Sequence, residues 1–107
     1  MTTAKLKKIL DELRGALSEH YGERLSKLVL FGSQARGDAE EDSDIDVLVV
    51  LNSPVRPLKE IAETGDFVAR ISAENGVVIN TLFVSQKEYD ARQEPVIINA
   101  AREGRAL

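Results

Sequence analysis

Two aspartates one residue apart, Asp44 and Asp46, are the side chains of this sequence best suited to chemistry. They stand where a run of aliphatic residues, 45–51, begins, and such a run is typical of a β-strand. Because side chains alternate along a strand, both carboxylates point to the same face of the sheet. Two neighbouring carboxylates repel each other, and a divalent cation relieves that repulsion. Since oxygen ligands select Mg²⁺ or Mn²⁺ over zinc, the pair predicts a site for one of these ions.

A glycine and a serine, Gly32 and Ser33, follow a second apolar run at residues 25–31. Glycine lets the backbone come close to a ligand, and a serine beside it can begin a short helical turn whose free N–H groups point outward. Such N–H groups bind phosphate. Arg36 lies close by, and two interpretations of it are open: a contact to the phosphate, or an ion pair with a neighbouring carboxylate. Together with the aspartates, the Gly-Ser pair predicts a site for a nucleotide with its Mg²⁺.

The spacing of these motifs is more specific than either motif alone. Gly32-Ser33, then ten residues, then Asp44-Ile45-Asp46 resembles the signature of the polymerase-β-type nucleotidyltransferase superfamily. The fuller string Gly-Ser-Gln-Ala-Arg-Gly-Asp-Ala, followed by Ser-Asp-Ile-Asp, resembles the minimal prokaryotic branch of that superfamily, the minimal nucleotidyltransferases. This branch includes the antitoxins that are paired with HEPN-domain toxins. The core of the match covers residues 32–46, and the order of the expected elements is similar to the family over most of the chain.

The resemblance implies a fold and a reaction. The fold would be an α/β (α+β) polymerase-β-like core, a small mixed β-sheet with helices packed mainly on one face. The reaction would be the Mg²⁺- or Mn²⁺-dependent transfer of AMP from ATP to a hydroxyl acceptor, which in this branch is a tyrosine of the cognate HEPN toxin. Asp44 and Asp46 match the catalytic, metal-holding carboxylates of the family. The candidate nucleotide-binding residues are Gly32, Ser33, Arg36 and Asp44.

One position departs from the family pattern. Active members usually carry a third carboxylate on the next strand, whereas the run that should form this strand, 77–84, contains no acid and has Asn80 at that place. An asparagine can offer an oxygen to a metal but cannot accept a proton as a base. Three outcomes are open: transfer with two acids and a base from the acceptor or water, nucleotide binding with slow or no transfer, and completion of the site by the partner.

A function from another class competes with transfer. The chain could be a non-catalytic or weakly catalytic interaction module that neutralises its partner by contact alone, with apolar residues of 96–107 as the interface. A third possibility is transfer of a nucleotide to one of the chain's own tyrosines, Tyr21 or Tyr89. Loss of neutralisation when Asp44 or Asp46 is replaced by asparagine would separate transfer from contact.

Composition limits the remaining possibilities. A length of 107 residues with 43% hydrophobic residues is expected to form one small domain, 1–107. The net charge of −4 and the scattered basic residues argue against direct nucleic-acid binding. The absence of cysteine excludes disulfides and thiolate metal sites. No apolar run is long enough to span a bilayer, so no membrane partner is expected and the cytoplasm is the expected compartment. A homo-oligomer or hetero-oligomer remains possible.

Hydrophobic periodicity predicts the elements that position the motifs. A helix is expected over 4–21, capped by Thr3 and ended by Gly22, and strands over 25–31, 45–51 and 77–84. A second helix is expected over 58–75, and the strand–helix–strand order predicts a crossover connection. The residues of this helix expected to face the sheet, with Gly65 near them, are Leu58, Ile61, Ala62, Val68 and Ile71.

The C-terminal part carries two further helix signals. Ser85 and Glu88 have the spacing of a capping box, which predicts a short helical segment containing Tyr89. Pro95 is expected to open a last helix that ends at Gly104.

Overall fold

The computed structural model describes all residues, 1–107, which are arranged around a four-stranded sheet with the strand order β3-β2-β1-β4. The strands are β1 (Leu25–Phe31), β2 (Ile45–Leu51), β3 (Ile79–Ser85) and β4 (Arg105–Ala106). β1 is antiparallel to both β2 and β4, whereas β2 and β3 are parallel. The expected mixed sheet is therefore confirmed, and so is the crossover connection between β2 and β3.

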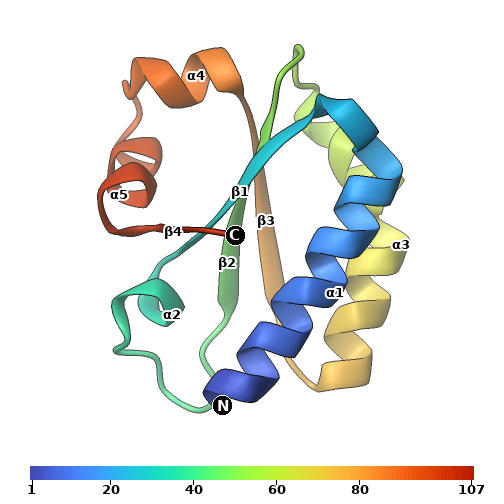
Figure 1. Ribbon diagram of the computed structural model, residues 1–107, viewed down its shortest axis with the longest axis vertical. Helices are drawn as coiled ribbons and strands as arrows, with labels where there is room; N and C mark the ends of the chain where they lie inside the picture. The colour runs from blue at the N-terminus through green and yellow to red at the C-terminus, as the bar shows by residue number, and fades with distance from the viewer.

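The two long helices lie on one side of the sheet and two short ones on the other (Figure 1). The long helices are α1 (Thr3–Tyr21) and α3 (Pro57–Asn75), and the short ones are α4 (Gln86–Ala91) and α5 (Pro95–Glu103). A single 3₁₀ turn, η1 (Gly22–Arg24), leads into β1, and a one-turn helix, α2 (Ser33–Arg36), follows it. No helix combines the length and the apolar composition that crossing a membrane would require.

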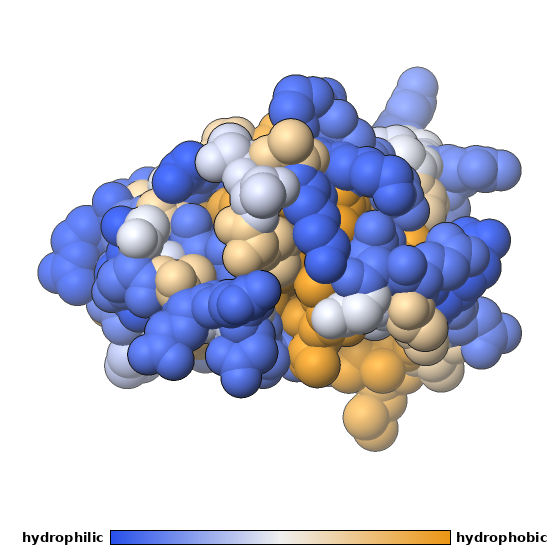
Figure 2. Space-filling model, turned by 90° about the horizontal axis from the view of Figure 1, so that it is seen from below, coloured by the Kyte–Doolittle hydropathy of each residue, from blue (hydrophilic) through white to orange (hydrophobic).

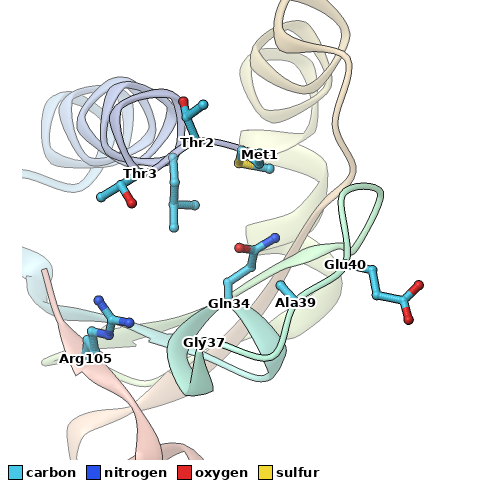
Figure 3. A pocket seen from close by; sticks show the side chains of 9 residues that line it. Met1, Thr2, Thr3, Gln34, Gly37, Ala39, Glu40 and Arg105 are labelled. Atoms are coloured by element: carbon cyan, nitrogen blue, oxygen red, sulfur yellow. The ribbon is translucent and has the colours of Figure 1, made fainter.

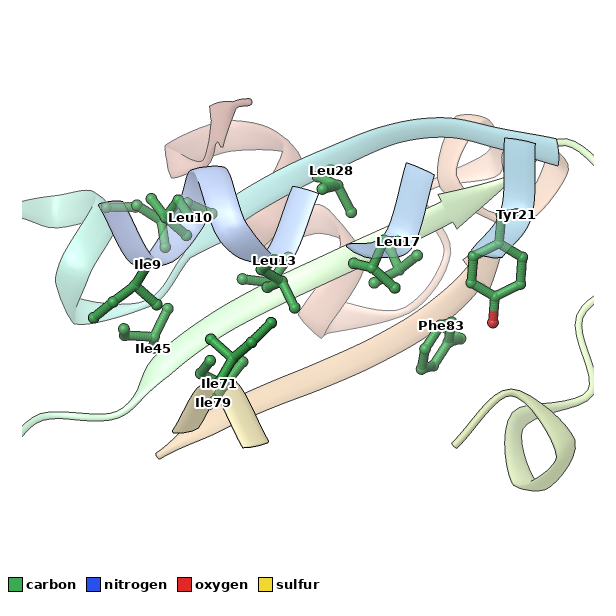
Figure 4. Close-up of a cluster of buried hydrophobic side chains, with 14 of the residues drawn as sticks. Ile9, Leu10, Leu13, Leu17, Tyr21, Leu28, Ile45, Ile71, Ile79 and Phe83 are labelled. Carbon is green, nitrogen blue, oxygen red and sulfur yellow. The ribbon is translucent and has the colours of Figure 1, made fainter. Parts of the chain in front are cut away.

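Alternation along the strands divides the core into two parts. Ile45, Val47 and Val49 of β2 pack under α1 and α3, where α1 directs Ile9, Leu13 and Leu17 at the sheet (Figure 4). The intervening Leu48 and Val50 belong to the smaller core under α4 and α5. Because Asp44 and Asp46 share the alternation of Leu48, they lie on the face of α4 and α5. At that end of the strands the face carries the two carboxylates in place of core residues.

The expected inner face of α3 is wrong in its first half. Leu58 and Ile61 are 85% and 51% exposed, and Ala62 is exposed as well. Glu60 and Thr64 are buried in their place, because they lie eleven and seven positions before the buried Ile71 and so share its side of the helix. The polar residues are satisfied there: the Glu60 carboxylate accepts hydrogen bonds from the Tyr21 hydroxyl (3.1 Å) and the Arg56 N–H (3.0 Å).

The second half of that face is confirmed, since Ile71 is buried and Val68 packs against the same core. Gly65 does not serve close packing, because a β-carbon there would meet no atom within 4 Å. The cap of α1 is Thr2 rather than Thr3: its hydroxyl accepts from the Lys5 N–H at 3.1 Å.

Two strand predictions also need correction. β3 begins at Ile79 rather than Val77, because the Val77 N–H still bonds to the Ser72 carbonyl at the end of α3. The two-residue strand β4, which pairs with Val29 and Leu30, was not expected from the sequence. The capping box at Ser85 and the last helix beginning at Pro95 are confirmed.

Candidate functional site

The two aspartates lie at the beginning of β2, as the sequence predicted. Asp44 directly precedes the strand and is exposed, whereas Asp46 is its second residue and is half-buried. Ile45 between them is fully buried on the opposite face. Strand alternation therefore places both carboxylates on the same face of the sheet.

Asn80 connects the two carboxylates. The parallel register of β2 and β3 places Asn80 directly beside Asp46. The amide nitrogen Nδ2 donates to Asp44 Oδ2 at 3.0 Å and to Asp46 Oδ1 at 3.1 Å. One neutral amide therefore bridges two acids at the position where the family pattern has a third carboxylate.

The turn after β1 approaches the same carboxylates. Phe31, the last residue of β1, pairs with Asp46, and Gly32 follows with φ +74°. A β-carbon on Gly32 would lie 2.5 Å from Asp46 Oδ2, so no larger residue fits without moving that carboxylate. The Gly32 carbonyl accepts from the N–H groups of Ala35 and Arg36, both at 3.1 Å, which closes the single turn of α2. The geometry thus brings the Gly-Ser turn and the two aspartates together.

Arg36 forms ion pairs rather than standing free. Its Nε lies 3.2 Å from Asp38 Oδ2 and its Nη1 lies 3.2 Å from Glu103 Oε1. The hydrogen bond to Asp38, with the charge of that carboxylate, raises the pKa of the guanidinium further above its ordinary value. These contacts tie α2 to the end of α5 and agree with the ion-pair interpretation. A contact between Arg36 and a bound phosphate is the alternative interpretation, which these ion pairs do not test.

Gln34 is a supporting residue that the sequence analysis did not single out. It is buried, and its Nε2 donates to the Ser43 carbonyl at 3.3 Å, which links α2 to the residue before Asp44. Figure 3 shows its side chain directed toward the first residues of α1 across a hollow that Arg105 and Thr3 also line. Arg105 donates to the Ala35 carbonyl through Nε (3.3 Å) and Nη2 (3.2 Å), which holds α2 from the other side. The position of Gln34 inside the Gly-Ser-Gln-Ala-Arg string was the only available signal.

The side chains present fit a magnesium ion that arrives with a nucleotide better than a closed metal site. No three Asp, Glu, His or Cys side chains lie together in a geometry that could hold a metal ion. Two carboxylate oxygens converge on one atom, Asn80 Nδ2, at the distances given above, and the same amide also carries an oxygen. Mg²⁺ in proteins is commonly held by one or two carboxylates, with water and substrate phosphates as the other ligands. Asp44, Asp46 and the Asn80 oxygen could therefore hold it.

Apolar side chains are exposed on several elements. Figure 2, a view of the lower end of the molecule, shows an apolar area on an otherwise largely hydrophilic surface. The exposed large hydrophobic residues are Leu58, Ile61, Val78, Leu82, Val96 and Ile98. The sequence indicated residues 96–107 as a possible interface with a partner. Ile97 and Ala100 of this segment are buried in the core under α4 and α5, so only its other residues could contact a partner.

Comparison with known proteins agrees with the motif. The family model of the nucleotidyltransferase domain matches residues 10–103. Over 101 residues, the chain is 34% identical to a Methanocaldococcus jannaschii protein named "Putative protein adenylyltransferase MJ0604", and the match covers 94% of this chain and 95% of the relative. A second relative, "Protein adenylyltransferase MntA" of Thermococcus cleftensis, is 41% identical over 49 residues, or 46% of this chain and 48% of that protein.

Two solved structures share the fold. One, described as "Structure of putative minimal nucleotidyltransferase", has a TM-score of 0.61 at 24% identity and covers 95% of each chain. The other, "Crystal structure of the toxin-antitoxin with AMP-PNP", has a TM-score of 0.58 at 14% identity and covers 99% of this chain and 72% of that one. The family match, the relatives and the fold lead to the same conclusion: the chain belongs to the nucleotidyltransferase domain family.

Proposed function

We propose that this protein transfers AMP from ATP to a tyrosine hydroxyl of a HEPN-type toxin and thereby acts as an antitoxin. The observation that carries the proposal is the approach of Gly32 to Asp46, because it sets the Gly-Ser turn next to the paired carboxylates. Relatives named as protein adenylyltransferases support AMP as the transferred group. The toxin-antitoxin structure with AMP-PNP, which shares the fold, supports a toxin as partner.

Each site residue has a role in this proposal. Asp44 and Asp46 would hold Mg²⁺ (or Mn²⁺), which would supply positive charge to offset that of the triphosphate. The Ser33 hydroxyl and the backbone from Gly32 onward bind the β- and γ-phosphates. This arrangement positions the substrate and offsets its charge, which accounts for most of what phosphoryl-type transfer requires.

The reaction forms one bond and breaks another at the α-phosphorus. The acceptor oxygen attacks it, the bond to the β-phosphate oxygen breaks, and pyrophosphate leaves with the bonding electrons. The acceptor proton passes to water or to a group of the partner, because Asn80 stands where a third acid could have accepted it and an amide is not a base.

The surroundings of the site suit an acceptor hydroxyl carried by an aromatic ring of another chain. Val78, which directly precedes β3, and Leu82 of β3 stand two positions before and after Asn80 and are 55% and 36% exposed. The ring of a docked tyrosine would cover them and bury apolar surface. The chain's own tyrosines, Tyr21 and Tyr89, are buried in the two cores, which disfavours transfer to either.

The proposal also covers the setting of the reaction. We take residues 1–107 as one minimal nucleotidyltransferase domain that works in the cytoplasm, where ATP is available, on a protein rather than a nucleic acid or a membrane. The negative net charge of −4 supports a partner other than nucleic acid.

The test is the intact mass of a HEPN toxin co-expressed with this protein. We expect the toxin to gain one or more AMP units with the natural protein and with Asp42→Asn, a matched change of an exposed loop acid. We expect none with Asp44→Asn or Asp46→Asn. An unmodified toxin in every combination would contradict the proposal.

Neutralisation by contact alone is the second candidate, and the exposed Val96 and Ile98 on α5 favour it. If Asp44→Asn and Asp46→Asn still protect cells from the toxin fully, contact is sufficient. If protection is lost together with the added AMP, transfer is the function.

A further inference from the structure

The Asn80 amide is the only side chain that partners the two carboxylates. The Asn80 side chain donates two hydrogen bonds, one to Asp44 and one to Asp46. Neither aspartate takes part in any ion pair of the molecule. The guanidinium closest to them in sequence, that of Arg36, is held by Asp38 and Glu103. Among the side chains of the protein, one neutral amide is therefore all that offsets the repulsion between the two acids.

A cation must compete with this amide. An asparagine side chain has donors on its nitrogen and an acceptor on its oxygen. Its nitrogen now points at both carboxylates, so it has to turn over before its oxygen can face a metal ion. Both hydrogen bonds are lost in that turn. An aspartate at this position would behave in the opposite way, because it would donate nothing to the acids and would add a third negative charge that attracts the cation.

The number of protein ligands is also low. Mg²⁺ requires close to octahedral coordination and gives up its water reluctantly. Two carboxylates, with an amide whose nitrogen already bonds to both of them, offer little to an ion that comes alone. A triphosphate adds phosphate oxygens and further negative charge at the same place. The cation then gains enough ligands to replace the hydrogen bonds of the amide.

We propose that Asn80 makes cation binding by Asp44 and Asp46 dependent on the triphosphate, so that the metal ion enters the site together with the nucleotide. Asn80 is thus a positioning residue whose amide bonds to both carboxylates until the cation and the nucleotide bind. This inference rests on the proposed function for the identity of the nucleotide, but it concerns binding and does not require transfer.

Calorimetric titration with MnCl₂ tests the inference, with and without the non-hydrolysable analogue AMP-PNP. For the natural protein we expect no resolved binding of Mn²⁺ alone and, after subtraction of the heat of Mn²⁺ binding to AMP-PNP without protein, clear binding when AMP-PNP is present. For Asn80→Asp we expect Mn²⁺ alone to bind at least tenfold more tightly than to the natural protein. We also expect the metal-free variant to melt at a lower temperature, and added Mn²⁺ to raise that temperature.

Asn99→Asp on α5 is the matched control, because it makes the same change in charge at an exposed residue whose Oδ1 already accepts from Arg102. It should behave as the natural protein does. Mn²⁺ binding to the natural protein as tightly as to Asn80→Asp, or unchanged affinity in Asn80→Asp, would overturn the inference.

A measurement on the natural protein avoids dependence on the folding of a variant. The side-chain ¹⁵N–¹H resonances of Asn80 should shift on addition of Mg²⁺ with AMP-PNP and stay in place with Mg²⁺ alone. A full shift with Mg²⁺ alone, or none with both, would overturn the inference. If this pattern holds but no toxin is modified, the proposed function fails alone. If the toxin is modified but Mg²⁺ alone moves Asn80, the inference fails alone.

Discussion

Gly32 and Asp46 approach each other so closely that a β-carbon on the glycine would lie 2.5 Å from the carboxylate oxygen Oδ2. The backbone of Gly32 also has φ +74°, a conformation in which residues with a β-carbon are strained. Glycine is thus required for two independent reasons, one local and one set by the contact of the turn after β1 with Asp46 of β2. The second reason connects the Gly-Ser turn to the aspartates physically, and it is why we treat the two motifs as one candidate site.

Gly32→Ala should therefore damage the site more than the fold. Backbone strain of this kind costs about 1–3 kcal/mol, which urea denaturation can measure. Gly37→Ala is the control, because Gly37 has φ +82° but no atom within 4 Å of its β-carbon position. We expect both variants to lose similar stability, and only Gly32→Ala to lose the rise in melting temperature caused by Mg²⁺ and AMP-PNP. Equal loss of that rise in both variants would show that strain alone matters.

The buried pair Tyr21 and Glu60 gives a prediction about stability and pH. Burial of the phenol, together with the charge of Glu60, raises the pKa of Tyr21 above its ordinary value of about 10. Below about pH 10 the Tyr21 hydroxyl keeps its proton in both the folded and the unfolded chain, so the Tyr21–Glu60 pair contributes fully to the free energy of unfolding. Above that pH the unfolded chain releases the proton while the folded protein keeps it. Stability should therefore fall as pH rises from about 10.

Tyr21→Phe isolates this effect. A hydrogen bond to a charged group contributes about 1.5–3 kcal/mol, so the variant should be less stable by about that amount at neutral pH. The difference between the two proteins should shrink as pH rises above about 10. Urea denaturation at a series of pH values provides the measurement. A difference that is constant with pH would mean that the Tyr21 hydroxyl does not keep its proton in the folded protein.

The sequence was sufficient where short-range patterns decide the structure. The three long strands were predicted within two residues, and Asp44 and Asp46 share a face because a strand alternates. The spacing between Gly32 and Asp44 indicates the same family as the family model that matches residues 10–103.

Long-range contacts limited the prediction elsewhere. The predicted buried face of α3 was wrong in its first half because Glu60 is stabilised inside the protein by a hydrogen bond from Tyr21, a residue 39 positions away. The strand β4 consists of two residues without a hydrophobic pattern, and it forms only because these residues pair with Val29 and Leu30 of β1. The role of Asn80 as a bridge required the register of β2 against β3, which no local pattern contains.

The function of Arg36 can be decided by comparing two variants. Arg36→Gln and Glu103→Gln both remove the ion pair between α2 and α5, but only the first removes a charge that could contact phosphate. Because Asp38 and Glu103 already engage the guanidinium, we expect both variants to bind AMP-PNP with Mg²⁺ within about twofold of the natural protein, a change well below 1.4 kcal/mol. Calorimetric titration measures this affinity. If the affinity for AMP-PNP falls tenfold in Arg36→Gln and does not change in Glu103→Gln, Arg36 contacts the phosphate.

The acceptor surface at Val78 and Leu82 can be tested without touching the nucleotide site. Val78→Thr keeps the shape of the side chain and adds a hydroxyl that a docked aromatic ring would have to desolvate. Burying a valine side chain contributes about 1.5–3 kcal/mol to binding. Because a loss of about 1.4 kcal/mol weakens binding tenfold, we expect the KM for the toxin to rise about tenfold. The melting-temperature rise with Mg²⁺ and AMP-PNP should not change. Val96→Thr, the same substitution at an exposed residue of α5, is the control and should leave KM unchanged. If Val96→Thr weakens toxin binding and Val78→Thr does not, the toxin docks on α5, and neutralisation by contact becomes the better explanation.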